Sequence, residues 1–247
     1  MYYYLYDSRL AEKKYGSTVA KIETRLTDLG INGKINHLSF LKNIQQVVGE
    51  ELKRGVKTIV IVGDDKTFGQ VINLIADFNV VVGFIPVEGK NDIARLLGIP
   101  EGEKACDVLS SRIIKKMDLG EINGYYFFTS LEVINHQVAL ECDNSYFINS
   151  EKKELAIKIA NLDCYQEAPT QPDDNKLDIF LTGPKSTFFW KKNTDPPTHL
   201  KAKNIRITSF KSTPILLNDD GRIIKTPATI TISHKKIKVI VGKNRLF

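Results

Sequence analysis

Two short polar loops in the first half of the chain carry the residue types from which phosphate-binding sites are built. Residues 63–66 (Gly-Asp-Asp-Lys) follow the apolar run 58–62, and residues 86–90 (Pro-Val-Glu-Gly-Lys) follow the apolar run 80–85. Each loop leads into a helical pattern, so backbone N–H groups and the positive end of a helix dipole are available to an anion. In parallel sheets ligands bind beyond the carboxyl ends of the strands, which is where both loops are expected.

The segments that must position these loops show strand patterns and helix patterns in alternation along the chain. Strands are indicated over residues 2–6, 34–39, 58–62 and 80–85. Apolar residues with helical spacing lie between and after them, over residues 17–29, 41–52, 68–75 and 93–97. This alternation predicts a doubly wound parallel α/β sheet.

From Asp118 onward the pattern changes to short strands separated by turn residues. Strand signals recur over residues 125–131, 137–141, 155–161, 177–181, 187–190, 205–210, 215–217, 228–233 and 237–241. Helical patterns are missing from this half, which predicts an antiparallel β-sandwich or barrel. We therefore expect an α/β domain over residues 1–117 and a β-sandwich domain over residues 118–247.

Composition and charge narrow the class of protein without choosing a function. The chain has 247 residues, of which 42% are hydrophobic and 26% charged, and its net charge is +6. These fractions indicate a folded globular protein and exclude disorder and low complexity. No apolar run approaches the roughly 18 residues of a membrane span, and the start of the chain lacks a signal-peptide pattern. Three scattered cysteines favour a reducing compartment, so a cytoplasmic protein is expected.

Taken in order, the two loops and one late turn resemble the diacylglycerol kinase catalytic-domain family, which includes bacterial lipid kinases and sphingosine kinases. The motif strand-Gly-Gly-Asp-Gly-Thr-helix is matched by Gly63, Asp65 and Thr67. The second motif, Pro-x-Gly-Thr-x-Asn-Asp-x-Ala-Arg, is matched by Pro86, Asn91, Asp92, Ala94 and Arg95. The third motif, Asp-Gly-Glu, corresponds to Asp220-Gly221-Arg222. The resemblance extends over most of the chain, from Tyr2 to about Val241.

The resemblance implies ATP-dependent phosphorylation of a lipid hydroxyl, with an α/β nucleotide-binding domain, a β-sandwich that holds the acceptor, and an active site between them. It assigns Asp220 as the general base and Asp65 as a ligand of Mg²⁺. The nucleotide-binding residues that it implies are Gly63, Asp65, Lys66, Thr67, Gly89, Lys90, Asn91 and Asp92. ATP and Mg²⁺ are thus the expected cofactors. A lipid or amphipathic small molecule is the expected partner, with peripheral contact at the inner membrane surface.

Charged residues stand where this family keeps room for the nucleotide phosphates: Asp64, Lys66, Glu88 and Lys90. A carboxylate about 4 Å from a phosphate would cost roughly 1–4 kcal/mol, whereas lysines could bind the phosphate as point charges. Two outcomes stay open, namely nucleotide binding through the lysines, or a cleft filled by pairing of the four charges. Arg222 replaces the acidic companion of Asp220 and is expected to make it a weaker base.

We therefore expect a lipid kinase of low activity. The alternative is a catalytically inactive relative that binds a lipid or a protein partner, and a third possibility is a kinase of a soluble nucleotide cofactor. Plainer interpretations also exist, because residues 63–66 suit an ordinary turn, Asp92 suits a helix cap and residues 218–221 suit a hairpin turn. No nucleic-acid partner is expected. Residues 188–192 (Phe-Phe-Trp-Lys-Lys) alone mix aromatic and basic side chains, and that mixture also suits a membrane interface.

Overall fold

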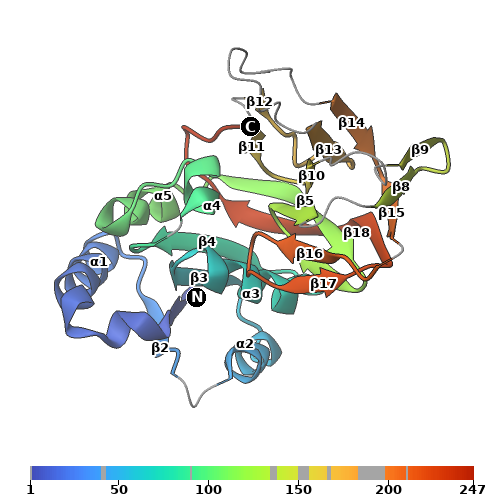
Figure 1. The fold of residues 1–247 in the computed structure, drawn as a ribbon. Helices are drawn as coiled ribbons and strands as arrows, with labels where there is room; N and C mark the ends of the chain where they lie inside the picture. Colours follow the sequence, from blue (N-terminus) through green and yellow to red (C-terminus); the bar gives the residue numbers. More distant parts are fainter. Residues whose placement is uncertain are drawn as a thin grey trace, which may run out of the picture. The chain divides into compact units, whose positions relative to one another are not determined.

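The fold, drawn in Figure 1, is known from a computed structural model. It describes residues 2–39, 43–89, 91–133, 138–149, 156–165, 168–182, 198–209 and 211–247. Lys90 and residues 188–192, both singled out above, lie outside the described residues. The chain divides into two units, of which unit 1 comprises Met1–Met117 and Lys235–Phe247, and unit 2 comprises Asp118–His234.

Unit 1 is built on a parallel sheet in the order β2-β1-β3-β4. Its strands are β1 (Tyr2–Tyr6), β2 (Gly33–His37), β3 (Thr58–Gly63) and β4 (Val81–Pro86). Every residue of β3 is buried, as expected of a central strand covered on both faces. Tyr6 pairs with Val62, so the carboxyl ends of β1 and β3 lie side by side.

The helices of unit 1 follow the strands in the predicted alternation. They are α1 (Gly16–Asp28), α2 (Ile44–Lys53), α3 (Asp65–Ile75), α4 (Asp92–Leu96) and α5 (Ala105–Ser111). α1 packs with α5, and α2 packs with α3. Short 3-10 helices occur at Ser8–Ala11, Lys13–Tyr15 and Gly102–Lys104. Among the described residues, no helix is long and apolar enough to cross a membrane.

Two β-sheets enclose the core of unit 2. One described sheet runs β14-β13-β10-β7-β16-β17, and the other includes β5, β6, β8, β9, β15 and β18. Their core is aliphatic, with residues such as Leu131, Ile159, Ile205 and Ile230 fully or almost fully buried. The first sheet consists of β14 (Thr198–Ala202), β13 (Leu177–Thr182), β10 (Ala156–Ala160), β7 (Ser130–Val133), β16 (Pro214–Leu217) and β17 (Ile223–Lys225). The second includes β5 (Ile114–Ile122), β6 (Tyr125–Phe127), β8 (Ala139–Cys142), β9 (Tyr146–Asn149), β15 (Asn204–Thr208) and β18 (Ala228–Ile240). A small sheet pairs β11 (Cys164–Tyr165) with β12 (Ala168–Pro169).

The predicted fold class, a parallel α/β domain followed by an antiparallel β-sandwich, is confirmed. One detail differs at the C-terminus. The sequence suggested two strands over residues 228–241 in the second domain, but a single strand, β18, runs from Ala228 to Ile240. Its end pairs with β4 through Lys238 and Val239, so residues 235–247 belong to unit 1. The polar residues between the expected strands continue the strand with exposed or half-exposed side chains instead of forming a turn.

Candidate functional site

The turn between β3 and α3 contains the first predicted phosphate loop. Asp64 is the N-cap of α3, and its Oδ1 accepts a hydrogen bond of 3.0 Å from the backbone N–H of Thr67. A carboxylate in this position stabilises a helix by satisfying a free N–H and by meeting the positive end of the helix dipole. Gly63 is required by packing, because a Cβ there would lie 2.8 Å from the Cβ of Asp7. The acidic residue at 64 therefore has a structural function within its own helix.

Arg9 is the cation that neutralises this carboxylate. Its Nη2 lies 2.8 Å from Oδ2 of Asp64, and its Nε lies 3.2 Å from Oδ1 of Asp7. Burial lowers the pKa of Arg9, but the two carboxylates outweigh burial and raise it. The hydroxyl of Thr67 donates a hydrogen bond to the other oxygen of Asp7. β1, β3 and α3 are thus connected by one polar network at the carboxyl ends of the strands.

The predicted pairing of lysines with Asp64 and Glu88 is not what the described residues form. Asp64 pairs with Arg9, while Lys66 is exposed and makes no ion pair within the described part of the chain. Lys66 is the second residue of α3, and its side chain is exposed to solvent. Arg9 was missed because it lies 55 positions before Asp64 in the sequence. A usable signal existed, since Asp7 and Arg9 directly follow the first apolar strand, just as residues 63–66 follow the third.

The second predicted loop, between β4 and α4, lies against the same network. Glu88 has φ +36° and Gly89 has φ +123°, so both adopt backbone conformations that favour glycine. A Cβ on Gly89 would lie 3.6 Å from the Cβ of Asp64 and 3.7 Å from Nη1 of Arg9. These are ordinary van der Waals distances, so it is the backbone conformation, and not lack of space, that favours glycine at position 89.

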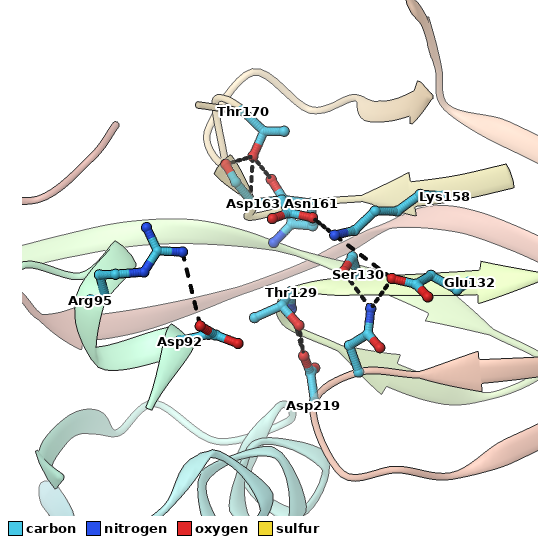
Figure 2. A network of polar contacts seen from close by, with 11 residues as sticks. Asp92, Arg95, Thr129, Ser130, Glu132, Lys158, Asn161, Asp163, Thr170 and Asp219 are labelled. Atoms are coloured by element: carbon cyan, nitrogen blue, oxygen red, sulfur yellow. Dashed lines mark hydrogen bonds and ion pairs between the residues drawn. The ribbon is translucent and has the colours of Figure 1, made fainter. Parts of the chain in front are cut away.

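Asp65 connects the two loops on their inner side. Its buried carboxylate accepts the backbone N–H of Ile93, in the first turn of α4, at 3.3 and 3.2 Å to its two oxygens. Asn91 is the N-cap of α4 but directs its amide to Glu101, 3.0 Å away. Asp92 is exposed, and its Oδ1 lies 3.9 Å from Nη2 of Arg95 (Figure 2). Both predicted loops thus meet, with Asp65 as the residue between them.

The two loops have some, but not all, of the features of a phosphate-binding site. The loop-then-helix geometry, the positive-φ residues and the Arg9 guanidinium are features that suit an anion. However, Asp64 and Asp65 already accept the N–H groups of Thr67 and Ile93. Among the described residues, no group of three or more His, Cys, Asp or Glu side chains could hold a metal ion.

In unit 2, the predicted base Asp220 lies in the turn between β16 and β17. Its side chain is 5% exposed, and its Oδ2 lies 3.4 Å from Nε of Arg222. Oδ1 of Asp220 also accepts the backbone N–H of Arg222, at 3.0 Å. The guanidinium of Arg222 lies over the ring of Tyr125, 4.2 Å from its centroid. The residue that replaces the family's glutamate is therefore the ion-pair partner of the candidate base.

Asp219, which the sequence analysis did not single out, fixes this turn to the rest of unit 2. It is buried and accepts hydrogen bonds from the backbone N–H groups of Phe128 and Thr129 and from the Thr129 hydroxyl, as Figure 2 shows for Thr129. Burial raises the pKa of Asp219 to about 6. The hydrogen bonds from Thr129 and Phe128 lower this pKa, and the neighbouring Asp220 raises it. No local pattern marked it, because its partners lie about 90 positions earlier in the chain.

The strands behind this turn carry a wider polar network. Lys158 lies between Glu132, at 3.8 Å, and Asp163 (Figure 2). The buried amide of Asn161 donates to the backbone oxygens of Asp118 and Phe128, at 2.9 and 2.8 Å. These bonds hold the β6–β7 turn to which Asp219 is attached.

Comparison with known proteins shows which sequences and folds this chain resembles. Residues 3–122 match the family described as "Diacylglycerol kinase catalytic domain". A diacylglycerol kinase of Bacillus subtilis (strain 168) is 27% identical over 127 residues, which cover 50% of this chain and 42% of that protein. A Staphylococcus haemolyticus protein that carries a lipid-kinase name is 22% identical over 91% of this chain and 89% of its own length.

Solved structures agree in fold over the whole chain. A diacylglycerol kinase structure from Bacillus anthracis str. Sterne has a TM-score of 0.78 at 20% identity, covering 99% of this chain and 97% of that one. A second structure from the same organism has a TM-score of 0.79 at 18% identity, with the same coverage. The resemblance inferred from the three sequence motifs is confirmed.

Proposed function

Since residues 3–122 match the diacylglycerol kinase catalytic-domain family and the chain has the fold of solved diacylglycerol kinase structures, we propose that it transfers a phosphoryl group from ATP to a lipid hydroxyl, and that it does so slowly. A lipid acceptor requires peripheral contact with a membrane surface, which is part of the proposal. The observation that carries the low rate is Asp64, whose carboxylate caps α3 and pairs with Arg9 in the predicted phosphate loop.

Asp64 weakens nucleotide binding in two ways. It accepts the Thr67 N–H that a phosphate oxygen would otherwise accept, and it brings a negative charge close to the incoming anion. At about 4 Å the repulsion alone amounts to roughly 1–4 kcal/mol, depending on exposure to solvent. Arg9 offsets part of this cost, because a guanidinium can bind a phosphate through two parallel hydrogen bonds. It must first give up its ion pairs with Asp64 and Asp7, whose N–O distances are 2.8 and 3.2 Å.

The acceptor half of the reaction depends on Asp220 in this proposal. A general base must take the proton of the lipid hydroxyl as the new O–P bond forms. Nε of Arg222 lies 3.4 Å from Oδ2 of Asp220, so a lipid hydroxyl must compete with this ion pair for the carboxylate. Both substitutions act in the same direction, toward slow turnover.

Calorimetric titration with MgATP tests the nucleotide half, using Asp64→Asn and Asp64→Gly. The asparagine keeps a cap acceptor and removes the charge, whereas glycine removes both. We expect each variant to bind MgATP about fivefold or more tightly than wild type, which corresponds to about 1 kcal/mol. Asp28→Asn, on an exposed position of α1, is the matched control and should change nothing. Micromolar binding by the wild type, unchanged in both Asp64 variants, would contradict the proposal.

A radiolabelled-ATP assay over diacylglycerol, sphingosine and phosphatidylglycerol tests the transfer itself. We expect turnover well below about one per second, the lower end of ordinary enzymes. The Asp220–Arg222 ion pair also favours a second candidate function, a catalytically inactive lipid-binding protein. Arg222→Glu separates the two. A slow kinase should become faster when the acidic companion is restored, whereas an inactive protein should stay without turnover on all three lipids.

A further inference from the structure

Unit 1 contains a pocket that shares no lining residue with the two predicted loops. It encloses about 300 Å³ and is formed where residues 98–104, residues 107–113 and residues 241–244 meet. Sites for small molecules usually enclose roughly 300–1,000 Å³, so this pocket is at the small end of that range. All of its lining residues belong to unit 1, so it is a feature of that unit alone.

The backbone around the pocket is fixed by close packing of two segments that are distant in sequence. Gly242 donates its N–H to the carbonyl of Leu97 at 2.9 Å. A Cβ on Gly98 would lie 2.4 Å from the backbone nitrogen of Arg245, and one on Gly242 would lie 1.8 Å from the carbonyl oxygen of Gly98. Because the segments already pack this closely, the pocket is formed before a ligand binds, and binding costs little conformational entropy.

The charges that line the pocket are predominantly positive. Lys104 and Lys243 are exposed, and within the part of the chain that the structure describes neither makes an ion pair or a side-chain hydrogen bond. The lining carboxylate, Asp107, is neutralised from outside the pocket, because its Oδ1 lies 2.5 Å from Nη2 of Arg25. Glu103, next to Lys104 in sequence, is exposed and does not line the pocket. Two uncompensated cations in one pocket favour a ligand with negative charge.

Aliphatic side chains line the same pocket and come from each of its three segments. Val241 is fully buried, Val108 and Ile113 are half-buried, and Pro100 is exposed. A ligand part that covers these groups removes their surface from water, which is favourable, whereas a free inorganic anion would leave them in water. Among the described residues no aromatic side chain lines the pocket, so a nucleotide base would have no ring to stack on.

We propose that this pocket binds a small amphiphilic anion, in which an anionic head is held by Lys104 and Lys243 and a short aliphatic chain lies against Val108 and Ile113. A water molecule in the liquid takes about 30 Å³, so a pocket of about 300 Å³ holds roughly ten groups of the size of a methylene. A chain of six to eight carbons with a carboxylate or phosphate head is about this large. The site does not rest on the proposed function, since none of its residues belongs to the loops or to the Asp220 turn.

Titration of the full chain, followed by amide NMR spectroscopy without ATP, tests the proposal. The probes are octanoate and hexyl phosphate, used below their micellar concentrations, so that the two kinds of head are compared. We expect the amide signals of Gly98, Val108 and Lys243 to shift along one saturable curve with at least one probe. Octanol lacks the charge and should bind about tenfold more weakly. Acetate lacks the chain and should lose at least as much, because each buried methylene adds affinity.

Substitutions of single lining residues locate the head and the chain. Lys104→Gln and Lys243→Gln should each weaken binding about threefold, and the double variant about tenfold, as expected for two exposed ion pairs whose effects add. Lys53→Gln is the matched control, because Lys53 is an exposed cation on α2 that does not line the pocket, and it should leave affinity unchanged. Val108→Thr keeps the shape of the side chain but adds a hydroxyl, and it should weaken binding about threefold.

Several results would overturn the proposal. These are the absence of a saturable shift at the pocket amides with either probe, binding of octanol or acetate as tight as that of the probes, and an equal loss in Lys53→Gln and Lys104→Gln. Unchanged affinity in Val108→Thr would overturn the position of the chain. Every measurement is made without ATP and without turnover, so failure of this site and failure of the proposed phosphoryl transfer are separate results.

Discussion

The buried carboxyl of Asp219 should make the stability of unit 2 depend on pH in a defined direction. Burial raises the pKa of Asp219 from 3.8 to about 6, against the opposing effect of donors from Thr129 and Phe128. Asp219→Asn removes the titration. The amide can still accept from Thr129, but it turns an NH₂ group toward another N–H donor, so the variant is less stable at neutral pH as well.

The sign follows from where the proton binds more tightly. The pKa of Asp219 is higher in the folded than in the unfolded chain, so the folded state gains stability from the protonated form. That contribution is complete below about pH 4 and is lost as the pH rises through about 6. A shift of about two pKa units corresponds to roughly 3 kcal/mol, lost at about 1.4 kcal/mol per pH unit. Above pH 6 to 7 the contribution stays constant.

The assay is urea unfolding at half-unit steps from pH 4 to 7.5, followed by circular dichroism. Amide hydrogen exchange in β7 reports on unit 2. The free energy of unfolding of wild type minus that of Asp219→Asn should fall by roughly 3 kcal/mol over this range. The same substitution at exposed Asp173 is the control and should give a difference that does not change with pH. A flat difference for Asp219→Asn, or one that rises with pH, would refute the argument that burial governs this carboxyl.

Three glycine-related substitutions test the packing of the predicted loops and of the second unit. Glu88→Gly should raise the free energy of unfolding by about 0.5–1 kcal/mol, because φ is +36° there, while Glu88→Ala should bring no gain in a calorimetric melting scan. Gly63→Ala should lower it by about 1–3 kcal/mol in urea titration, since the new Cβ would meet Asp7 at 2.8 Å; an unchanged midpoint would contradict this contact. Gly120→Ala should cost about 3 kcal/mol, because its Cβ would lie 2.0 Å from the Phe127 ring, and Gly16→Ala, at φ −52° with nothing within 4 Å, gives the comparison for loss of a glycine alone.

Local periodicity was enough to predict most elements of unit 1, but not all of them and not all of their contacts. α1, α3 and β3 were expected within a few residues of their bounds, because apolar spacing and buried runs are properties of short windows. α5 (Ala105–Ser111) was not expected, since seven residues give too few turns to establish a period. The long strand β18 was divided in two because its middle is polar.

For the candidate site, too, the motif residues could be predicted from local sequence, whereas contacts between distant residues could not. The motif positions Gly63, Asp65, Thr67 and Gly89 were found in sequence, and the structure brings them together in unit 1. The partner of Asp64 could not be found that way. Its pairing with Arg9 depends on β1 lying next to β3, and strand order is set by packing of the whole sheet. The charge at position 66 was nearer in sequence, but proximity in sequence does not decide the direction of a side chain on a helix.

The two substitutions that distinguish this chain share one physical effect, and that effect leads to a last prediction. Asp64 takes an N–H and a guanidinium that a phosphate could use, and Arg222 takes the carboxylate that a hydroxyl proton could use. Under the proposed function, each replaces a contact with ligand by a contact within the chain, so stability and ligand affinity should change in opposite directions. Asp64→Gly should lose about 1 kcal/mol of stability, from its helix cap and its ion pair, while its MgATP affinity rises. Parallel urea and calorimetric titrations measure both, and a variant that loses stability without gaining affinity would show that Asp64 serves the fold alone.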